Sequence, residues 1–347
     1  MEYLLPAYDD PLFSIILIIL VSLLIALLTY GWGIHKQHKE EGNLLRFLDT
    51  FESAECRLDT STMVFENNML KPLTLLATAF ENTGEYHKSI NIYLYLIKHI
   101  EQTQGQLELM ERLGSTYLHA GFLERSRSIY LEILRKQPRN KQVLKELGIV
   151  YEMLHDYEKA QEILEPLAIL GENTHDLEVF LHLSSLLHDK GKTPQDKVLG
   201  LKGIFQKEPS LYRPIISALF QLDTQSAWEY IHLNRIEEIL DILWFLPQSQ
   251  INEERICQDK ALQTLYYAKG YLPLALSQSD IFNLDIIATA KAQGHEEIDL
   301  SFSYLCNKCK QSFPMSFRRC PSCMCINSLK VDTNIVKKQI HTGFSLL

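Results

Sequence analysis

Four cysteines near the end of the chain have the spacing of metal ligands. Cys306 and Cys309 form one CxxC pair, and Cys320 and Cys323 form a second pair after ten intervening residues. Each CxxC turn brings two sulfur atoms together, and two such turns can surround one ion with four thiolates. Because four of the seven cysteines fall within 18 residues, scattered use in a core explains them poorly. The spacing therefore predicts a metal site with four cysteine ligands.

Two other uses of these cysteines remain open: a pair of disulfides, or a redox-active CxxC. Disulfides need an oxidising compartment, whereas the membrane topology predicted from the N-terminal segment places these residues in the cytosol. A redox CxxC usually opens a helix in a βαβ unit, which the surrounding sequence does not predict. Four thiolates with no open position favour structural zinc, and rubredoxin-type iron is the alternative.

The segment that must position the cysteines is short and covers residues 301–331. Apolar runs flank each CxxC and predict a small ribbon of two or three strands. About 30 residues cannot bury enough apolar surface to be stable alone, so a bound ion is expected to hold the ribbon together. Residues 332–347 are expected to form a tail.

The opposite end of the chain is predicted to be a membrane anchor, residues 1–34. Within it, residues 13–30 carry no charge and are almost entirely apolar. This length is close to the ~20 residues that cross a bilayer, and Tyr30 and Trp32 suit its interface. A cleaved signal peptide fits less well, because no basic region precedes the apolar run and no small-residue cleavage site follows it.

The flanks of the anchor predict its orientation. The upstream side is acidic, and the downstream side carries Lys36, Lys39 and Arg46. The positive-inside rule then places the N-terminus outside and residues 35–347 in the cytoplasm.

Residues 35–300 are predicted to be a tetratricopeptide-like array of helix pairs, which makes the chain mostly α. The clearest repeats cover residues 70–103, 107–140 and 141–174. Residue types recur 34 positions apart at Gly114 and Gly148, Tyr117 and Tyr151, and Ser126 and Ala160. The small residues at the first and last of these places let paired helices cross closely, and such hairpins bury their apolar faces only by stacking. Beyond residue 175 the pattern weakens but stays helical.

Repeat arrays bind partners on the concave face lined by the first helix of each pair. In this frame the polar residues expected to face a protein partner are Lys71, Thr74, Thr78, Glu81, Glu108, Glu111, Ser115, Gln142, Lys145 and Glu152. The alternative is that they are solvated surface residues, since only a few residues of an interface dominate binding.

The sequence gives little support to an enzyme or a nucleic-acid binder. Residues 191–193 read GKT, but a P-loop needs glycine where Leu186 stands, and the HE pair at His295 lacks the second histidine because position 299 is Asp299. No GxSxG or GxGxxG motif is present. The net charge of −9 argues against general nucleic-acid binding, although residues 302–347 carry seven basic residues and one acid.

The order of anchor, helical array and four-cysteine ribbon resembles the bacterial lipopolysaccharide assembly protein B family. The ribbon carries the closest local match: Cys306-x-x-Cys309, then Arg319-Cys320-Pro-Ser-Cys323 and a short basic strand ending at Lys330. The resemblance implies a rubredoxin-like ribbon, with Cys306, Cys309, Cys320 and Cys323 as ligands, that packs on the repeats. It also implies a single-pass protein of the bacterial inner membrane with a periplasmic N-terminus.

The function implied by this resemblance is that of an adaptor. Proteins of the family couple a membrane-anchored AAA+ protease to the deacetylase of lipid A synthesis and so regulate lipopolysaccharide production. This chain differs in having a shorter array, and in Lys310 and Met324 at positions where such turns often carry glycine. The alternatives are a scaffold for another envelope process and a rubredoxin-like iron redox protein.

Overall fold

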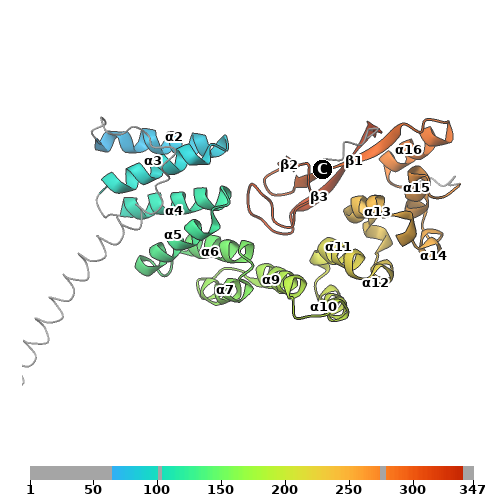
Figure 1. Ribbon diagram of the computed structural model, residues 1–347, viewed down its shortest axis with the longest axis horizontal. Helices are drawn as coiled ribbons and strands as arrows, with labels where there is room; N and C mark the ends of the chain where they lie inside the picture. The colour runs from blue at the N-terminus through green and yellow to red at the C-terminus, as the bar shows by residue number, and fades with distance from the viewer. Residues whose placement is uncertain (1–64, 101–103, 274–278, 339–347) are drawn as a thin grey trace, which may run out of the picture. The chain divides into compact units, whose positions relative to one another are not determined.

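The computed structural model describes residues 65–100, 104–273 and 279–338 (Figure 1). These residues are mostly helical, with a small three-stranded sheet near the C-terminal end, as the sequence predicts. The chain divides into two compact units, and the boundary along the sequence falls inside helix α5, after Ile129. The predicted anchor, residues 1–34, lies outside the described residues. Among the helices that the structure describes, none has both the length and the apolar character needed to cross a membrane.

The first unit is built from paired helices. Its elements are η2 (Asn67–Met69), α2 (Leu70–Asn82), α3 (Tyr86–His99), α4 (Gln104–His119) and the first half of α5 (Leu123–Lys136). The hydroxyl of buried Ser126 donates to the carbonyl oxygen of Gly114 at 2.8 Å. The small residues that recur in the sequence pattern thus let α4 and α5 approach closely here.

The second unit contains the remaining helices and the ribbon. Its α-helices are α6 (Lys141–Met153), α7 (Tyr157–Glu162), α8 (Leu164–Ile169), α9 (His175–His188), α10 (Pro194–Lys207), α11 (Tyr212–Leu222), α12 (Thr224–Glu229), α13 (Leu240–Phe245), α14 (Glu253–Ile256), α15 (Lys260–Lys269) and α16 (Phe282–Ala292). Short 3-10 turns are η3 (Pro209–Leu211), η4 (Leu233–Ile239) and η5 (Gln248–Gln250). One apolar core runs from Leu183 on α9 to Leu300 in the ribbon.

The same left-handed turn joins the two helices of each predicted repeat. Gly84, Gly121 and His155 occupy it with φ of 78°, 80° and 59°. In each turn the next residue donates its N–H to the carbonyl oxygen of an aromatic residue in the first helix, for example Phe122 to Tyr117 at 2.8 Å. The helix-pair periodicity expected from the sequence is therefore present in the backbone, including the third repeat, where histidine replaces glycine.

The second helix of the third repeat is broken into α7 and α8. Ile163 separates the two short helices, and Pro166 follows it. Proline has no N–H with which to continue the helical ladder, which accounts for an interruption near this point. A Cβ added at Gly148 of α6 would lie 3.6 Å from the Ile163 side chain, so α6 and this break are packed at ordinary contact distance.

The ribbon is an antiparallel sheet of order β2-β1-β3, formed by β1 (Ile298–Cys306), β2 (Ser312–Phe313) and β3 (Leu329–Lys337). Tyr304 pairs with Val331 in the β1–β3 register. Both long strands extend beyond the boundaries expected for residues 301–331, and β3 includes the first part of the predicted tail. Apolar and polar residues alternate along 329–332, which is the sequence pattern of such a strand.

Candidate metal centre

The four predicted ligands, Cys306, Cys309, Cys320 and Cys323, lie together in the ribbon. Their sulfur atoms are all within 4.8 Å of one another. Sγ of Cys306 lies 3.7 Å from Sγ of Cys323, and the Cys309 and Cys320 sulfurs are also 3.7 Å apart. Around a tetrahedral ion with metal–sulfur bonds of about 2.3 Å, neighbouring sulfurs are about 3.8 Å apart. This donor set therefore fits one tetrahedral metal ion.

Both cysteine pairs are held by the same backbone turn. The N–H of Lys310 donates to the carbonyl oxygen of Cys306 at 2.9 Å, and the N–H of Met324 donates to that of Cys320 at 3.0 Å. Lys310 and Met324 have φ of 62° and 55°, in the left-handed region where glycine is usual. The two non-glycine residues noted in the sequence thus adopt the glycine conformation, and the two halves of the site share one geometry.

The surroundings of two of the thiols shift their pKa values in opposite directions, downward for Cys306 and upward for Cys320. Burial opposes ionisation of Cys306, but hydrogen bonding with the Ser328 hydroxyl and with nearby backbone N–H groups lowers the pKa of its thiol to about 6. Burial raises the pKa of Cys320 to about 12, and the sulfurs of Cys323 and Cys306 raise it further. A bound cation would favour all four thiolates at once, because its charge offsets both burial and mutual repulsion.

Arg319, next to the second CxxC, joins the ribbon to helix α6. Its Nε donates to both carboxylate oxygens of Glu152 at 3.2 and 3.0 Å, and its Nη2 also donates to this carboxylate. Its Nη1 donates to the carbonyl oxygen of Met324. The guanidinium carbon lies 5.4 Å from the centre of the Phe180 ring. With side chains only 12% and 11% exposed, Arg319 and Glu152 form a buried ion pair beside the ligand Cys320.

A second buried carboxylate, Asp241 on α13, also connects helices to the ribbon. It accepts hydrogen bonds from Arg213 of α11 at 2.6 and 2.7 Å and from the hydroxyl of Tyr304 on β1 at 2.9 Å. Burial raises the pKa of Tyr304 to about 12, with the negative charge of Asp241 contributing. Because Tyr304 lies two residues before Cys306, this network holds the first CxxC against the helices.

Sequence reasoning did not find these two connections. Asp241 does carry a local indication, since a lone acid inside the otherwise apolar α13 needs a buried partner. Arg319 is distinguished in the sequence only by its place before Cys320, and nothing in that local sequence indicates an acidic partner on a distant helix. Glu152 belongs to the surface predicted to face a partner protein, but the structure pairs it with the ribbon of the same chain.

The other residues of that predicted surface are distributed over α2, α4 and α6. Glu81 accepts a hydrogen bond from Thr116 at 2.7 Å, Lys145 pairs with Glu172 at 2.7 Å, and Thr78 lies 3.5 Å from the Tyr93 hydroxyl. The rest are exposed or half-buried: Lys71, Thr74, Glu108, Glu111, Ser115 and Gln142. Their role in binding a partner stays a prediction.

Comparison with known proteins adds no family assignment. Neither the models of protein families nor the curated proteins give a match to this chain. The resemblance to the lipopolysaccharide assembly protein B family therefore rests on the residues and their order alone.

Proposed function

We propose that this chain is a non-enzymatic, membrane-anchored cytoplasmic scaffold in which a metal ribbon and a helical body form one protein-binding platform. The observation that carries the proposal is the junction between them. Two buried carboxylates on the helices bind the ribbon: Glu152 forms an ion pair with Arg319, and Asp241 accepts a hydrogen bond from the Tyr304 hydroxyl. Helical repeats bind proteins through extended surfaces, and a ribbon held at two points would keep such a surface in one shape.

The metal in this proposal is structural zinc, held by Cys306, Cys309, Cys320 and Cys323. The donor set supports zinc, because four thiolates leave no open position for substrate. The ion would cross-link the two CxxC turns and supply the stability that so small a ribbon lacks. The metal-bound second CxxC turn would then position Arg319 in two ways. Its backbone is attached to the ligand Cys320, and its guanidinium donates to the carbonyl oxygen of Met324.

The finer proposal comes from the family resemblance. The chain would regulate lipopolysaccharide synthesis at the bacterial inner membrane by coupling a membrane AAA+ protease to the lipid A deacetylase. An anchor confines the array to the membrane surface and so raises its effective concentration near membrane enzymes.

Affinity purification of the intact, detergent-solubilised protein from its own cells tests this function. We expect mass spectrometry to identify the protease or the deacetylase, with recovery reduced for a variant carrying Cys306→Ser and Cys309→Ser. Glu85→Gln is the matched control, because the Glu85 carboxylate forms an exposed ion pair with Lys88 in the first unit, far along the chain from the cysteines. Recovery of other envelope machinery without either enzyme would overturn the lipopolysaccharide assignment.

A rubredoxin-like iron protein is the second candidate, and one observation favours it. Cys309 and Cys323 are half-buried rather than fully buried, which leaves two of the four sulfurs near solvent, where electrons could be exchanged. Iron in a tetrathiolate site would give a coloured protein with sulfur-to-metal absorption. Purification of a colourless protein with one zinc per chain would remove this candidate.

A further inference from the structure

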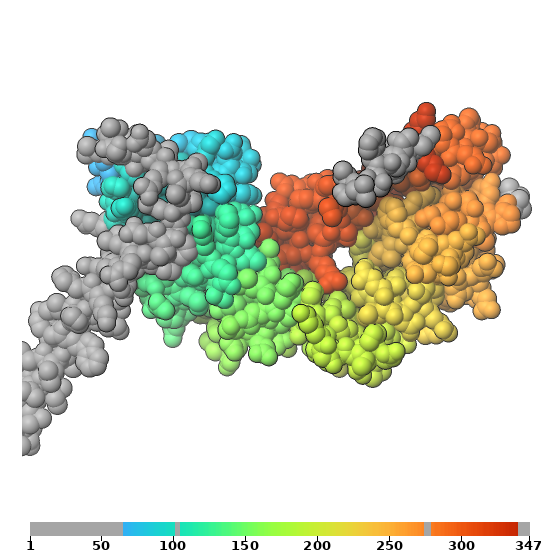
Figure 2. Space-filling model, viewed as in Figure 1, coloured from blue at the N-terminus to red at the C-terminus, as the bar shows by residue number. Residues whose placement is uncertain are grey.

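A cleft lies between the ribbon and helix α11 in the second unit. Its volume is about 540 Å³, and Figure 2 shows an opening between the orange-red ribbon and the yellow helices. Residues 327–331 line the ribbon side, and side chains of α11 and η4 line the other. The volume falls within the roughly 300–1,000 Å³ typical of ligand sites.

The ribbon side of the cleft includes the open edge of strand β3. In the order β2-β1-β3, this strand has a paired neighbour on one side only. The N–H of Asn307 donates to the carbonyl oxygen of Ser328 at 2.7 Å, so residue 328 faces β1. Because facing and non-facing residues alternate in an antiparallel ladder, Leu329 and Val331 turn their backbone N–H and C=O groups to the open edge.

A contact farther along the strand supports this assignment and limits the open edge. The carbonyl oxygen of Thr333, the next residue in the alternation, accepts a hydrogen bond from Asn283 Nδ2 at 2.9 Å. Leu329 and Val331 have no such bond to any residue that the structure describes. A short length of unpaired strand edge therefore borders the cleft, and unpaired edges are templates for another strand.

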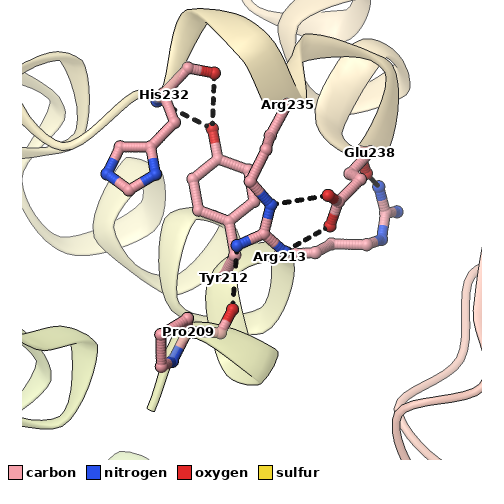
Figure 3. A network of polar contacts seen from close by, with 6 residues as sticks. All are labelled: Pro209, Tyr212, Arg213, His232, Arg235 and Glu238. Carbon is pink, nitrogen blue, oxygen red and sulfur yellow. Dashed lines mark hydrogen bonds and ion pairs between the residues drawn. The ribbon is translucent and has the colours of Figure 1, made fainter. Parts of the chain in front are cut away.

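The opposite wall is held in place by the network in Figure 3. Arg235 of η4 donates to both carboxylate oxygens of Glu238 at 2.6 and 2.7 Å and to the carbonyl oxygen of Pro209 at 2.8 Å. Its guanidinium carbon lies 4.3 Å from the centre of the Tyr212 ring. Arg213 donates to the backbone oxygen of Glu238 at 2.6 Å. These bonds tie η4 to α11, and a wall formed in advance reduces the entropy lost on binding.

The charges around the cleft indicate what would fill it. Arg213 is already paired with Asp241. Exposed Arg318 and Lys330, on the ribbon side, form no ion pair within the described residues. Glu237 and Glu238 lie on the opposite wall, and Glu238 is paired with Arg235. A carboxylate of an occupant is therefore favoured on the ribbon side, beside Arg318 and Lys330 and away from these two acids.

We propose that the cleft binds an extended, acidic peptide segment of a partner protein, which adds as a strand to the edge of β3 at residues 329–331. Backbone hydrogen bonds to the strand edge supply affinity, while Arg318 and Lys330 select carboxylates. This inference deepens the proposed scaffold function and names the kind of partner segment that the scaffold takes.

The test uses the full-length, zinc-loaded chain in detergent and a phage-displayed library of random ten-residue peptides. The best binder is synthesised with a fluorescent label, and its affinity is measured by anisotropy.

Val331→Pro removes one outward N–H from the cleft edge, and proline is tolerated at sheet edges. Ile335→Pro is the matched control, because it removes an outward N–H farther along the same edge. Lys330→Glu reverses a charge at the cleft, and Lys337→Glu is its control, because Lys337 lies on the same strand but does not line the cleft.

We expect enriched peptides to carry acidic residues. Losing one hydrogen bond in Val331→Pro should weaken binding roughly 2- to 10-fold, and Lys330→Glu combined with Arg318→Glu should weaken it roughly tenfold or more. The two control variants should stay within about twofold of the wild type. N-methylation of alternate peptide nitrogens should abolish binding to the unaltered protein, which tests strand addition without any protein variant.

Failure to enrich acidic peptides would overturn the inference, as would binding that survives both N-methylation and Val331→Pro. The scaffold function can fail separately. If Val331→Pro still captures the protease or the deacetylase from cells as well as the wild type does, the cleft is not the site but the scaffold stands.

Discussion

The guanidinium of Arg319 holds both carboxylate oxygens of Glu152, a residue 167 positions earlier in the chain. The arginine precedes the ligand Cys320, and it also donates to the carbonyl oxygen of Met324, the residue after the ligand Cys323. Its position is thus set by the second CxxC turn. Folding of the metal site and the contact with helix α6 are physically linked by this one side chain.

The first prediction concerns that ion pair. In Glu152→Gln the neutral amide leaves the buried guanidinium of Arg319 without a counter-charge, and removing one partner of a buried pair costs about 3 kcal/mol or more. We expect a loss of this order in the free energy of unfolding of the second unit, measured by urea titration. Combining Glu152→Ala with Arg319→Ala in a double-mutant cycle should show coupling of about 1 kcal/mol or more.

An exposed ion pair provides the control. Glu85 and Lys88 are 2.8 Å apart, but their side chains are about half exposed, so Glu85→Gln should change stability by less than about 1 kcal/mol. Equal effects of Glu85→Gln and Glu152→Gln would show that the Arg319–Glu152 contact is not a buried pair in solution.

The second prediction concerns metal removal. Stripping the ion with a chelator should abolish hydrogen-exchange protection along β1 and β3, because the ribbon depends on the metal for its stability. Helices α2 and α3 in the first unit should keep their protection and serve as the internal control. Adding one equivalent of zinc should restore the ribbon. A metal-free chain whose β1 and β3 amides stay protected would contradict a structural role for the ion.

Local features of the fold could be predicted from the sequence, because they depend on neighbouring residues. The CxxC spacing predicts the four clustered sulfurs, and the recurrence of Gly84 and Gly121 before an aromatic-lined second helix predicts the turns between helices. At Lys310, the departure from glycine in the sequence corresponds to a positive φ in the structure.

Features that depend on tertiary contacts could not be predicted in the same way. The partners of Glu152 and Asp241 come from segments far along the chain, and no periodicity relates them. A glutamate on the first helix of a repeat has the same local sequence whether it faces solvent, a partner protein or this chain's own ribbon. The start of β3 could be predicted from the alternating residues 329–332, whereas its end at Lys337 could not, because residues 333–337 do not alternate.

The third prediction compares two glycines of the repeat pattern. Gly121 has φ of 80°, so Gly121→Ala forces a side chain into the left-handed region and should destabilise the first unit by about 1 kcal/mol. Gly148 lies within helix α6, where an added Cβ would meet Ile163 at an ordinary 3.6 Å. Because alanine is a better helix former, Gly148→Ala should be neutral or stabilising by up to about 1 kcal/mol. Thermal unfolding should show a loss of stability for Gly121→Ala and none for Gly148→Ala, and a large loss at Gly148 would mean that α6 packs more tightly than described.

The fourth prediction concerns Asp241. In Asp241→Asn, Arg213 loses its counter-charge and Tyr304 loses a charged acceptor, although both side chains stay buried or nearly so. We expect a loss of about 3 kcal/mol in stability, together with increased hydrogen exchange along β1. Asp223→Asn is a suitable comparison, because Asp223 caps the short helix α12 and has no contact with the ribbon in the described structure; it should cost only about 1 kcal/mol. Unchanged exchange along β1 in Asp241→Asn would show that this carboxylate does not hold the ribbon.

The fifth prediction is a pH dependence. Burial raises the pKa of Tyr212 from 10.0 to about 12, against opposing hydrogen bonding to His232. The folded chain therefore keeps this proton at pH values where the unfolded chain has lost it. The stability that this proton contributes is complete below pH 10 and is lost as the pH rises toward about 12, at about 1.4 kcal/mol per pH unit. Urea titrations between pH 9 and 11.5 should show a shallower decline for Tyr212→Phe than for the wild type, even though the variant starts lower because it lacks the bond with the His232 N–H. Parallel declines would mean that Tyr212 ionises equally easily in the folded and unfolded chains, and hence that the wall formed by α11 and η4 is open to solvent.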